Sequence, residues 1–239
     1  MKSIRSIIIA GICMLSFTSC IKEVISGSGP EVTEVRNTGS FTGIELALNA
    51  TVNYKQDSVC KVEITAQQNV LNEIQTEISG SQLVIKLPWD TKLVSYSPIT
   101  INISAPGVDA FNVSGSGKIQ SFSNVAVINA DLNISSSGSI NISSITASDI
   151  DVRVSGSGTV QISSGSTATQ SMNISGSGLI DVLGVTAKTA STYTSGSGDI
   201  KLTATENLTA HISGSGKVYY MGNPVIDANI SGSGKLIHL

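Results

Sequence analysis

Through the second half of the chain, apolar and polar residues alternate in short runs that return at a nearly constant interval. Three columns emerge when the runs are aligned on the Ser-Gly-Ser-Gly motif that accompanies them. One residue before the motif stand Val113, Ile134, Val154, Ile174, Thr194, Ile212 and Ile230. Five residues after its first serine stand Ile119, Ile140, Val160, Ile180, Ile200, Val218 and Leu236, and seven after it stand Ser121, Ile142, Ile162, Val182, Leu202, Tyr220 and His238. Mostly β-branched residues two apart favour half-buried strands, so the columns predict stacked strands that face inward.

The motif itself sets the period. Complete copies begin at Ser114, Ser155, Ser175, Ser195, Ser213 and Ser231, and a Ser-Ser-Ser-Gly variant begins at Ser135. Neighbouring copies lie 18 to 21 residues apart, which is typical of a solenoid with one coil per repeat. Since glycine reaches φ > 0 at little steric cost, we expect the motif to turn each corner of the coil.

These patterns predict an all-β protein in which residues 107–239 form a parallel β-helix with coils of about 20 residues. Parallel strands are connected almost always by right-handed crossovers, so the helix is expected to be right-handed. A β-propeller blade needs about 40 residues, twice the observed period. A transmembrane barrel would carry apolar outward columns, whereas the outward columns here are polar.

Residues 38–106 are not repetitive but alternate in the same way. The alternation predicts strands over residues 41–48, 50–55, 59–65, 83–87 and 99–104. One segment, 67–77, has apolar residues at helical spacing and is the candidate for a single short helix. Cys60 alternates with Val59 and Val62, which predicts a buried structural thiol.

The first twenty residues have a separate meaning. Lys2 and Arg5 precede a short apolar stretch, and small residues then lead to Cys20, as in a secretory signal. The segment resembles a bacterial lipoprotein signal, which implies a signal peptide over residues 1–19 and lipid attachment, including palmitate, at Cys20. An ordinary signal peptide is the alternative. Residues 20–37, with their Ser-Gly-Ser-Gly-Pro stretch, are expected to form a flexible tether.

The composition argues against several classes of binding partner. Charged residues make up 13 %, aromatic residues 4 %, and the formal net charge is −3. With no basic run beyond the extreme N-terminus, nucleic acid is not an expected partner. The cysteines have no metal-type spacing and the two histidines are far apart, so no metal or other cofactor is expected.

The order of these parts resembles a known family. Phe41-Thr-Gly-Ile44, the strands that follow, Gly80-Ser-Gln-Leu-Val-Ile85 and Val113-Ser-Gly-Ser-Gly-Lys-Ile119 occur in sequence. The whole is similar to the putative auto-transporter adhesin family, whose unit is called the head GIN domain, over residues 38–239. The resemblance implies a β-helical domain and a cell-envelope address, and the family offers no catalytic motif to transfer.

Candidate catalytic groups are few. Parallel β-helices include enzymes that cleave polysaccharides, so acidic residues on the outward positions matter. Two outward columns lie two residues before and six residues after the first serine of each motif, and Asp181 is the one acid in them. Asp149 and Asp151 share a face two residues apart. No paired carboxylates of the glycosidase kind emerge, so we do not expect an enzyme.

Candidate ligand contacts lie near the C-terminal coils. Tyr193 and His211 occupy successive places in one outward column, and Lys201 and Tyr219 do so in another. Aromatic side chains beside polar groups can hold sugars or protein loops, whereas ordinary surface residues are the alternative. Asparagines recur in the outward column of Tyr193 and His211, at 112, 133, 173 and 229, where stacked amides are expected.

Two functions follow as expectations. The first is a lipid-anchored protein of the bacterial envelope, in the outer membrane, that acts as an adhesin or surface-binding module for a glycan or a protein. The second is a structural or scaffold protein without a ligand. In either case the last coil, residues 231–239, is expected to offer unpaired backbone groups for self-association.

Overall fold

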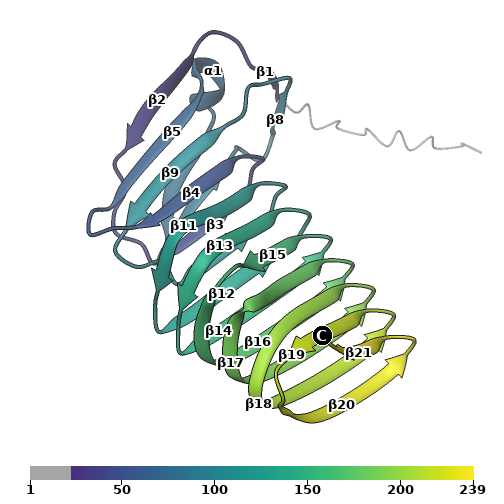
Figure 1. Ribbon diagram of the computed structural model, residues 1–239. Helices are drawn as coiled ribbons and strands as arrows, with labels where there is room; N and C mark the ends of the chain where they lie inside the picture. The colour runs from purple at the N-terminus through teal and green to yellow at the C-terminus, as the bar shows by residue number, and fades with distance from the viewer. Residues whose placement is uncertain (1–22) are drawn as a thin grey trace, which may run out of the picture.

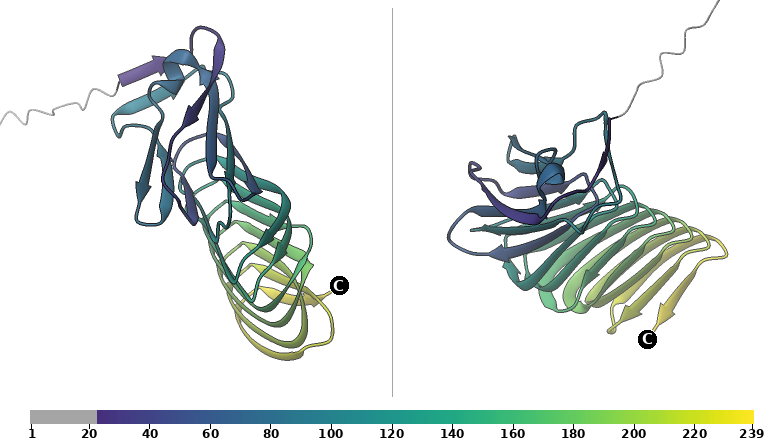
Figure 2. Two further views of the ribbon diagram at one scale, coloured as in Figure 1. Left: turned by 90° about the vertical axis from the view of Figure 1, so that its left-hand side faces the viewer. Right: turned by 90° about the horizontal axis from the view of Figure 1, so that it is seen from above.

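The computed structural model describes residues 23–239 as a rod of stacked β coils with a broader N-terminal end (Figures 1 and 2). The coils follow one another in chain order along the rod, and the last strands lie at the end opposite the N-terminal part. The polypeptide thus forms the expected parallel β-helix with one coil per repeat, since every strand pair in the repeat region is parallel. The hand of the coil stays a prediction.

One parallel stack contains the strands that lead into the corners. In spatial order it consists of β7 (Gln82–Lys86), β3 (Gly43–Leu46), β10 (Ala110–Val113), β12 (Asn129–Ile134), β14 (Asp149–Gly156), β16 (Gly165–Gly176), the later halves of β17 (Leu179–Gly196) and β18 (Asp199–Gly214), and β20 (Val225–Gly232). The long strands β17 and β18 contribute to both stacks because they continue around a bend of the coil.

The second stack contains the strands that leave the corners. It consists of β9 (Thr100–Ala105), β4 (Thr51–Gln56), β11 (Lys118–Ala126), β13 (Ser139–Thr146), β15 (Thr159–Ile162), the first halves of β17 and β18, β19 (Lys217–Met221) and β21 (Lys235–His238). The strands β3 and β4 form a coil of their own, on which the first repeat stacks.

Antiparallel strands cover the N-terminal end of both stacks. β5 (Lys61–Gln67) pairs with β9, and β2 (Glu31–Arg36) pairs with β5. β6 (Gln75–Ser79) pairs with β7 on the other stack. A separate small sheet joins β1 (Glu23–Ser26) to β8 (Thr91–Val94), and the short helix α1 (Gln68–Leu71) follows β5.

The three apolar columns form the core inside the coils. Val154, Ile180 and Leu202 are buried, as are most of their equivalents from the first repeat onward. The last coil is different, because no further coil covers it: Ile230 is 43 % exposed and His238 is exposed. The sequence columns therefore identify the core correctly, except at the end of the stack.

The two glycines of the motif have different roles. Gly176, the first glycine of its copy, has φ +135, and a Cβ there would lie 2.4 Å from the carbonyl oxygen of Gly156. Gly178, the second glycine, has no positive φ, but a Cβ would lie 2.5 Å from the side chain of Val154. Close packing between coils, as well as backbone conformation, thus requires glycine at the corner. Ser136 replaces the first glycine in the variant motif, where φ is not positive.

The structure differs from three local expectations. The expected short helix is present but is limited to α1. Residues 72–73 form a turn, and residues 75–77 belong to β6, where pairing with β7 satisfies their backbone groups. Cys60 was expected to be buried but is exposed, because it lies in the loop between β4 and β5, directly before β5 begins. Much of the expected tether 20–37 forms β1 and β2 instead. The signal peptide and Cys20 lie outside the described residues.

Candidate binding surfaces

Two of the predicted contact residues meet on the flank of the rod. Tyr193 in β17 and His211 in β18 are register partners, and their rings stack with centroids 4.9 Å apart and planes 22° apart. Tyr193 is 48 % exposed. The pair lines a shallow hollow of about 400 Å³ with Asn173, Asn229 and the corner serines 195, 213 and 231. This arrangement offers an aromatic face surrounded by hydroxyl and amide groups.

The other predicted pair lies on the second stack. Lys201 and Tyr219 are register partners in β18 and β19, and both are half-buried. Lys201 Nζ lies 3.1 Å from Asp181 Oδ2, so its charge is already paired. Lys201 and Tyr219 do not line the hollow of Tyr193 and His211. Each predicted pair thus lies side by side, the fold does not bring the two pairs into one site, and ligand contact by either pair stays a prediction.

The expected amide stacking is present at one place in the first outward column. Asn133 Nδ2 donates to Asn112 Oδ1 at 3.0 Å. Further along that column the ring pair of Tyr193 and His211 takes the place of amides. The column therefore stabilises neighbouring coils at one end and exposes aromatic surface at the other.

The candidate acids make local contacts instead of converging. Asp151 Oδ2 lies 2.6 Å from Arg153 Nη2, and Asp131 Oδ1 lies 3.4 Å from Nη1 of the same arginine. Desolvation raises the pKa of Asp151 above its usual value, against the Arg153 charge, which lowers it. Asp149 accepts a hydrogen bond from Thr169. These carboxylates thus take part in salt bridges and a hydroxyl contact with neighbouring strands.

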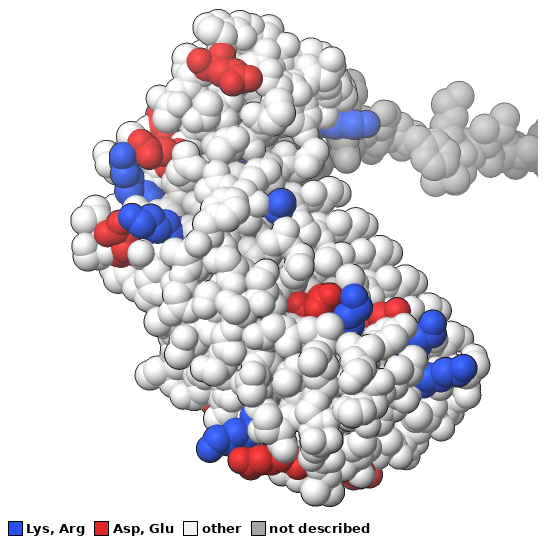
Figure 3. All heavy atoms as spheres, in the orientation of Figure 1, with Lys and Arg blue, Asp and Glu red and all other residues white. Residues whose placement is uncertain are grey.

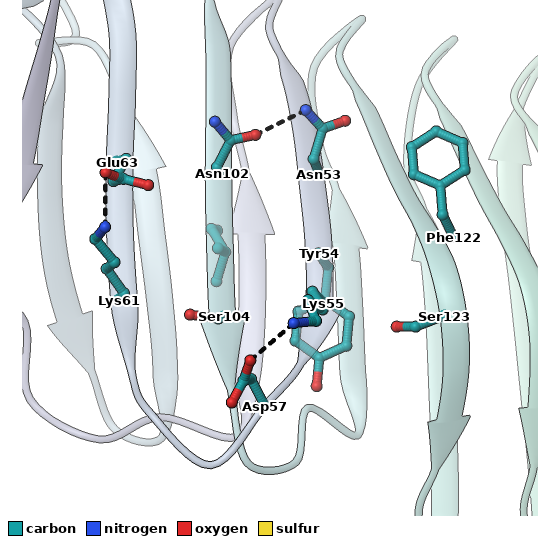
Figure 4. A pocket seen from close by; sticks show the side chains of 11 residues that line it. Asn53, Tyr54, Lys55, Asp57, Lys61, Glu63, Asn102, Ser104, Phe122 and Ser123 are labelled. Atoms are coloured by element: carbon teal, nitrogen blue, oxygen red, sulfur yellow. Dashed lines mark hydrogen bonds and ion pairs between the residues drawn. The ribbon is translucent and has the colours of Figure 1, made fainter.

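A larger hollow lies where the N-terminal cap meets the first repeat, on the outer face of β5, β9, β4 and β11 (Figure 4). Its volume is about 540 Å³. Side chains from the four adjacent strands form two cross-strand rows in it. One row is Glu63, Asn102 and Asn53, which Gln120 continues in register outside the lining, and the other begins with Lys61, Ser104 and Lys55. Sequence analysis did not identify this hollow.

The first row is joined by amide hydrogen bonds. Asn53 Nδ2 donates to Asn102 Oδ1 at 2.9 Å, and Gln120 Nε2 donates to Asn53 Oδ1 at 2.7 Å.

The charged residues of the hollow form ion pairs. Lys55 Nζ lies 2.9 Å from Asp57 Oδ2, and Lys61 Nζ lies 2.8 Å from Glu63 Oε1. The hydrogen bond from Lys55 lowers the pKa of Asp57, which keeps that carboxyl ionised.

Phe122 borders the hollow on the β11 side and is 77 % exposed. It lies in a bulge, because the pairing of β11 with β13 shifts between Ser121 and Asn124. Asn102, Asn53 and Phe122 project from the same face of the sheet, whereas the ring of Tyr54 lies behind the strands (Figure 4). A sequence signal exists for this bulge. The interval between the motifs at Ser114 and Ser135 is one residue longer than the next interval.

Charged groups are sparse over the face shown in Figure 3, and basic and acidic side chains often lie next to each other there. Within residues 23–239 no cluster of three histidine, cysteine or acidic side chains could hold a metal ion. Across the same residues, no helix has the length and apolar character needed to cross a membrane.

Comparison with solved structures finds the same fold. A protein described as a putative adhesin from Bacteroides fragilis NCTC 9343 superposes with a TM-score of 0.84 at 23 % identity, over 90 % of this chain and 100 % of that one. A putative lipid binding protein from Parabacteroides distasonis ATCC 8503 gives a TM-score of 0.75 at 24 % identity, over 91 % and 100 % of the two chains. A putative adhesin from Parabacteroides merdae ATCC 43184 gives 0.73 at 18 % identity, over 91 % and 99 %.

Identities this low establish the fold alone. No curated protein matches the chain. The model of the family described as putative auto-transporter adhesin, head GIN domain, matches residues 40–224, well over half of the chain. An adhesin family indicates a protein of the cell surface or envelope. The chain therefore belongs to the putative auto-transporter adhesin family with the head GIN domain, as the order of its sequence motifs predicted.

Proposed function

We propose that this protein is a non-enzymatic binding module of the bacterial cell envelope, an adhesin for a glycan or a protein. The observation that carries the proposal is the stacked pair of Tyr193 and His211, whose rings lie 4.9 Å apart beside a hollow lined by amides and hydroxyls. A rigid flank that exposes aromatic surface can bind a ligand without a conformational change. Lys201 and Tyr219, which are register neighbours in β18 and β19, provide a second contact surface.

The absence of convergent acid and base groups supports binding over catalysis. Asp149, Asp151 and Asp181 each have a hydrogen-bonding or ion-pair partner in their own coil or its neighbour. A glycosidase would need two carboxyl groups facing each other across a cleft. The hollow of Tyr193 and His211 has no acidic residue in its lining. The larger hollow has two, Asp57 and Glu63, and each is paired with a lysine.

The membrane anchor is the second part of the proposal. Residues 1–19 act as a signal peptide, Cys20 carries the lipid in the outer membrane, and residues 38–239 form the binding domain. The charged start and short apolar segment of the sequence support this. β1 lies at the capped end of the rod, so an anchor there would project Tyr193 and His211 away from the membrane (Figure 1).

The test is surface accessibility on intact cells. External protease should remove the protein from cells that express the native chain, and the Cys20→Ala variant should no longer fractionate with membranes. Protection of the native chain until the outer membrane is opened would contradict a surface adhesin.

A scaffold is the second candidate, favoured by the uncovered final coil, where every residue of β20 is exposed. A glycan array separates the two functions. Binding that the Tyr193→Ala and His211→Ala variants lose would support the module. Binding to no glycan and no surface protein, together with assembly into filaments, would support the scaffold.

A further inference from the structure

We propose that the hollow across β5, β9, β4 and β11 is a binding site for a neutral oligosaccharide. The proposal rests on the function proposed above and adds a further site with a defined ligand class. The site lies at the junction of the cap and the first repeat, away from Tyr193 and His211. Three features of its chemistry lead to this ligand.

The first feature is the amide row. Asn53 bridges its neighbours, donating to Asn102 and accepting from Gln120. These bonds fix the orientation of all three amides, and the –NH2 group of Asn102, which lines the hollow, is left to donate to a ligand. A surface that offers fixed donors and acceptors in one line is complementary to sugar hydroxyl groups, which both donate and accept.

The second feature is Phe122. Phe122 continues the outward alternation of Lys118 and Gln120 where the bulge in β11 begins, and it is 77 % exposed at the edge of the hollow. An exposed large apolar ring at a bulge indicates an interaction site, because bulges are over-represented next to functional sites. The ring faces the same side as the amide row, so it can stack on the C–H face of a pyranose whose hydroxyl groups reach the amides.

The third feature is the charge balance. Lys55 is paired with Asp57 at 2.9 Å, and Lys61 is paired with Glu63 at 2.8 Å. The four charges cancel, so the hollow attracts neither a phosphate nor a polyanionic chain. The affinity for an uncharged ligand does not depend on a net charge in the hollow, and the ion pairs supply further polar contacts for its hydroxyl groups.

The fold also suggests how a linear chain would lie. Asn141 and Gln161 continue the column of Gln120 along β13 and β15. Neighbouring strands are about 4.8 Å apart, a step comparable to one sugar residue in an extended chain. An oligosaccharide running along the rod would therefore meet an amide side chain at each step beyond Phe122.

Isothermal titration with linear glucan, xylan and mannan oligosaccharides, and with uronic-acid oligosaccharides of equal length, tests the proposal. We expect the native chain to bind at least one neutral series and to bind acidic oligosaccharides more weakly. Phe122→Ala should weaken the neutral binding by about tenfold, whereas Phe122→Tyr should retain it. Asn53→Ala should weaken it as well, because the row loses its central bridge.

Tyr193→Ala is the matched control at the other hollow. Phe122 is so exposed that its replacement should leave the thermal melting curve unchanged, which separates lost contact from lost fold. Neutral binding that survives Phe122→Ala but disappears in Tyr193→Ala would overturn this site and leave the proposed adhesin function intact. No binding to any neutral oligosaccharide, or a preference for acidic ones, would also overturn it. The surface-accessibility test decides the proposed function independently of either result.

Discussion

At the scale of single residues, the hydroxyl group of Thr194 is an anomaly in the core. Thr194 is 2 % exposed and occupies a column otherwise filled by valine and isoleucine. Its Oγ1 atom is buried without a hydrogen-bond partner among the described residues. A buried hydroxyl that has lost its water and gained nothing destabilises the folded state.

Replacing this hydroxyl by a methyl group should therefore stabilise the protein. We expect Thr194→Val to raise the free energy of unfolding by about 1 kcal/mol, measured by urea denaturation. Val154→Thr, the reverse change in the same column, should lower it by about 1–3 kcal/mol. A loss of stability in Thr194→Val would contradict the assignment and would indicate a water molecule bound inside the coil.

Tyr54 couples folding to alkaline pH. Its ring is buried against Phe111, its hydroxyl donates to Ala105 O at 3.3 Å, and it accepts a hydrogen bond from Val108 N at 3.2 Å. Burial raises the pKa of Tyr54 from 10.0 to about 12, although the Val108 hydrogen bond opposes the shift. The folded state thus holds the phenol proton more tightly than the unfolded chain does.

The sign of the effect follows from that difference. The stabilisation by protonated Tyr54 is complete below pH 10 and is lost as pH rises toward about 12. The loss should amount to about 2 kcal/mol. Tyr54→Phe should be less stable at neutral pH but should show a smaller decline between pH 10 and 12 in urea titrations at fixed pH. Equal slopes for both proteins would show that other groups cause the alkaline decline.

At the scale of elements, the position of a strand in the stack sets its contribution to stability. Ile180 in β17 is fully buried between coils on both sides. Leu236, its equivalent in β21, is partly exposed because β21 pairs with β19 on one side only. In a solenoid each coil contacts only its neighbours, so an end coil contributes fewer packed contacts than an internal one.

This difference predicts unequal effects for the same kind of truncation. Ile180→Ala should lower the free energy of unfolding by about 2–5 kcal/mol, and Leu236→Ala by less than about 1 kcal/mol. Chemical denaturation of the two variants provides the measurement. Similar losses in both would mean that the last coil is as well packed as the interior, for example through association.

Changes in coil length are also an element-scale property. The first full repeat is one residue longer than the second, and the additional residue appears as the bulge in β11 where Phe122 lies. Where the interval falls to 18 residues, the pairing of β17 with β18 shifts instead. Insertions and deletions are therefore absorbed away from the corners, because the corner glycines pack against the coil before them and tolerate no displacement.

At the scale of the whole molecule, the two ends of the rod are unequal. Antiparallel strands β2, β5 and β6 cover the first coils. At the other end every residue of β20 is exposed, including Val225 at 74 % and Ile226 at 42 %. An apolar sheet edge with unpaired backbone groups favours association with another strand.

We therefore expect self-association through this end. Sedimentation velocity should show a species that grows with protein concentration, and Ile230→Lys should return it to the monomer because a charge on the exposed apolar end opposes contact. The matched control is Val35→Lys on the exposed face of β2 at the capped end, which should leave association unchanged. A native chain that stays monomeric at high concentration would contradict the prediction.

The sequence alone determined the repeat architecture and the core columns, because every coil repeats the same alternation around the same corner motif. It also placed Tyr193 next to His211, since residues one period apart in a solenoid become register neighbours. In the non-repetitive part of the chain, only the tertiary structure decides which strands pair and which side chains are buried. It limited the expected helix to α1, left Cys60 exposed, and paired β9 with β4 so that Asn102 lies beside Asn53. Those contacts join segments far apart in the chain, and their register depends on which strands have unpaired edges once the coils have formed.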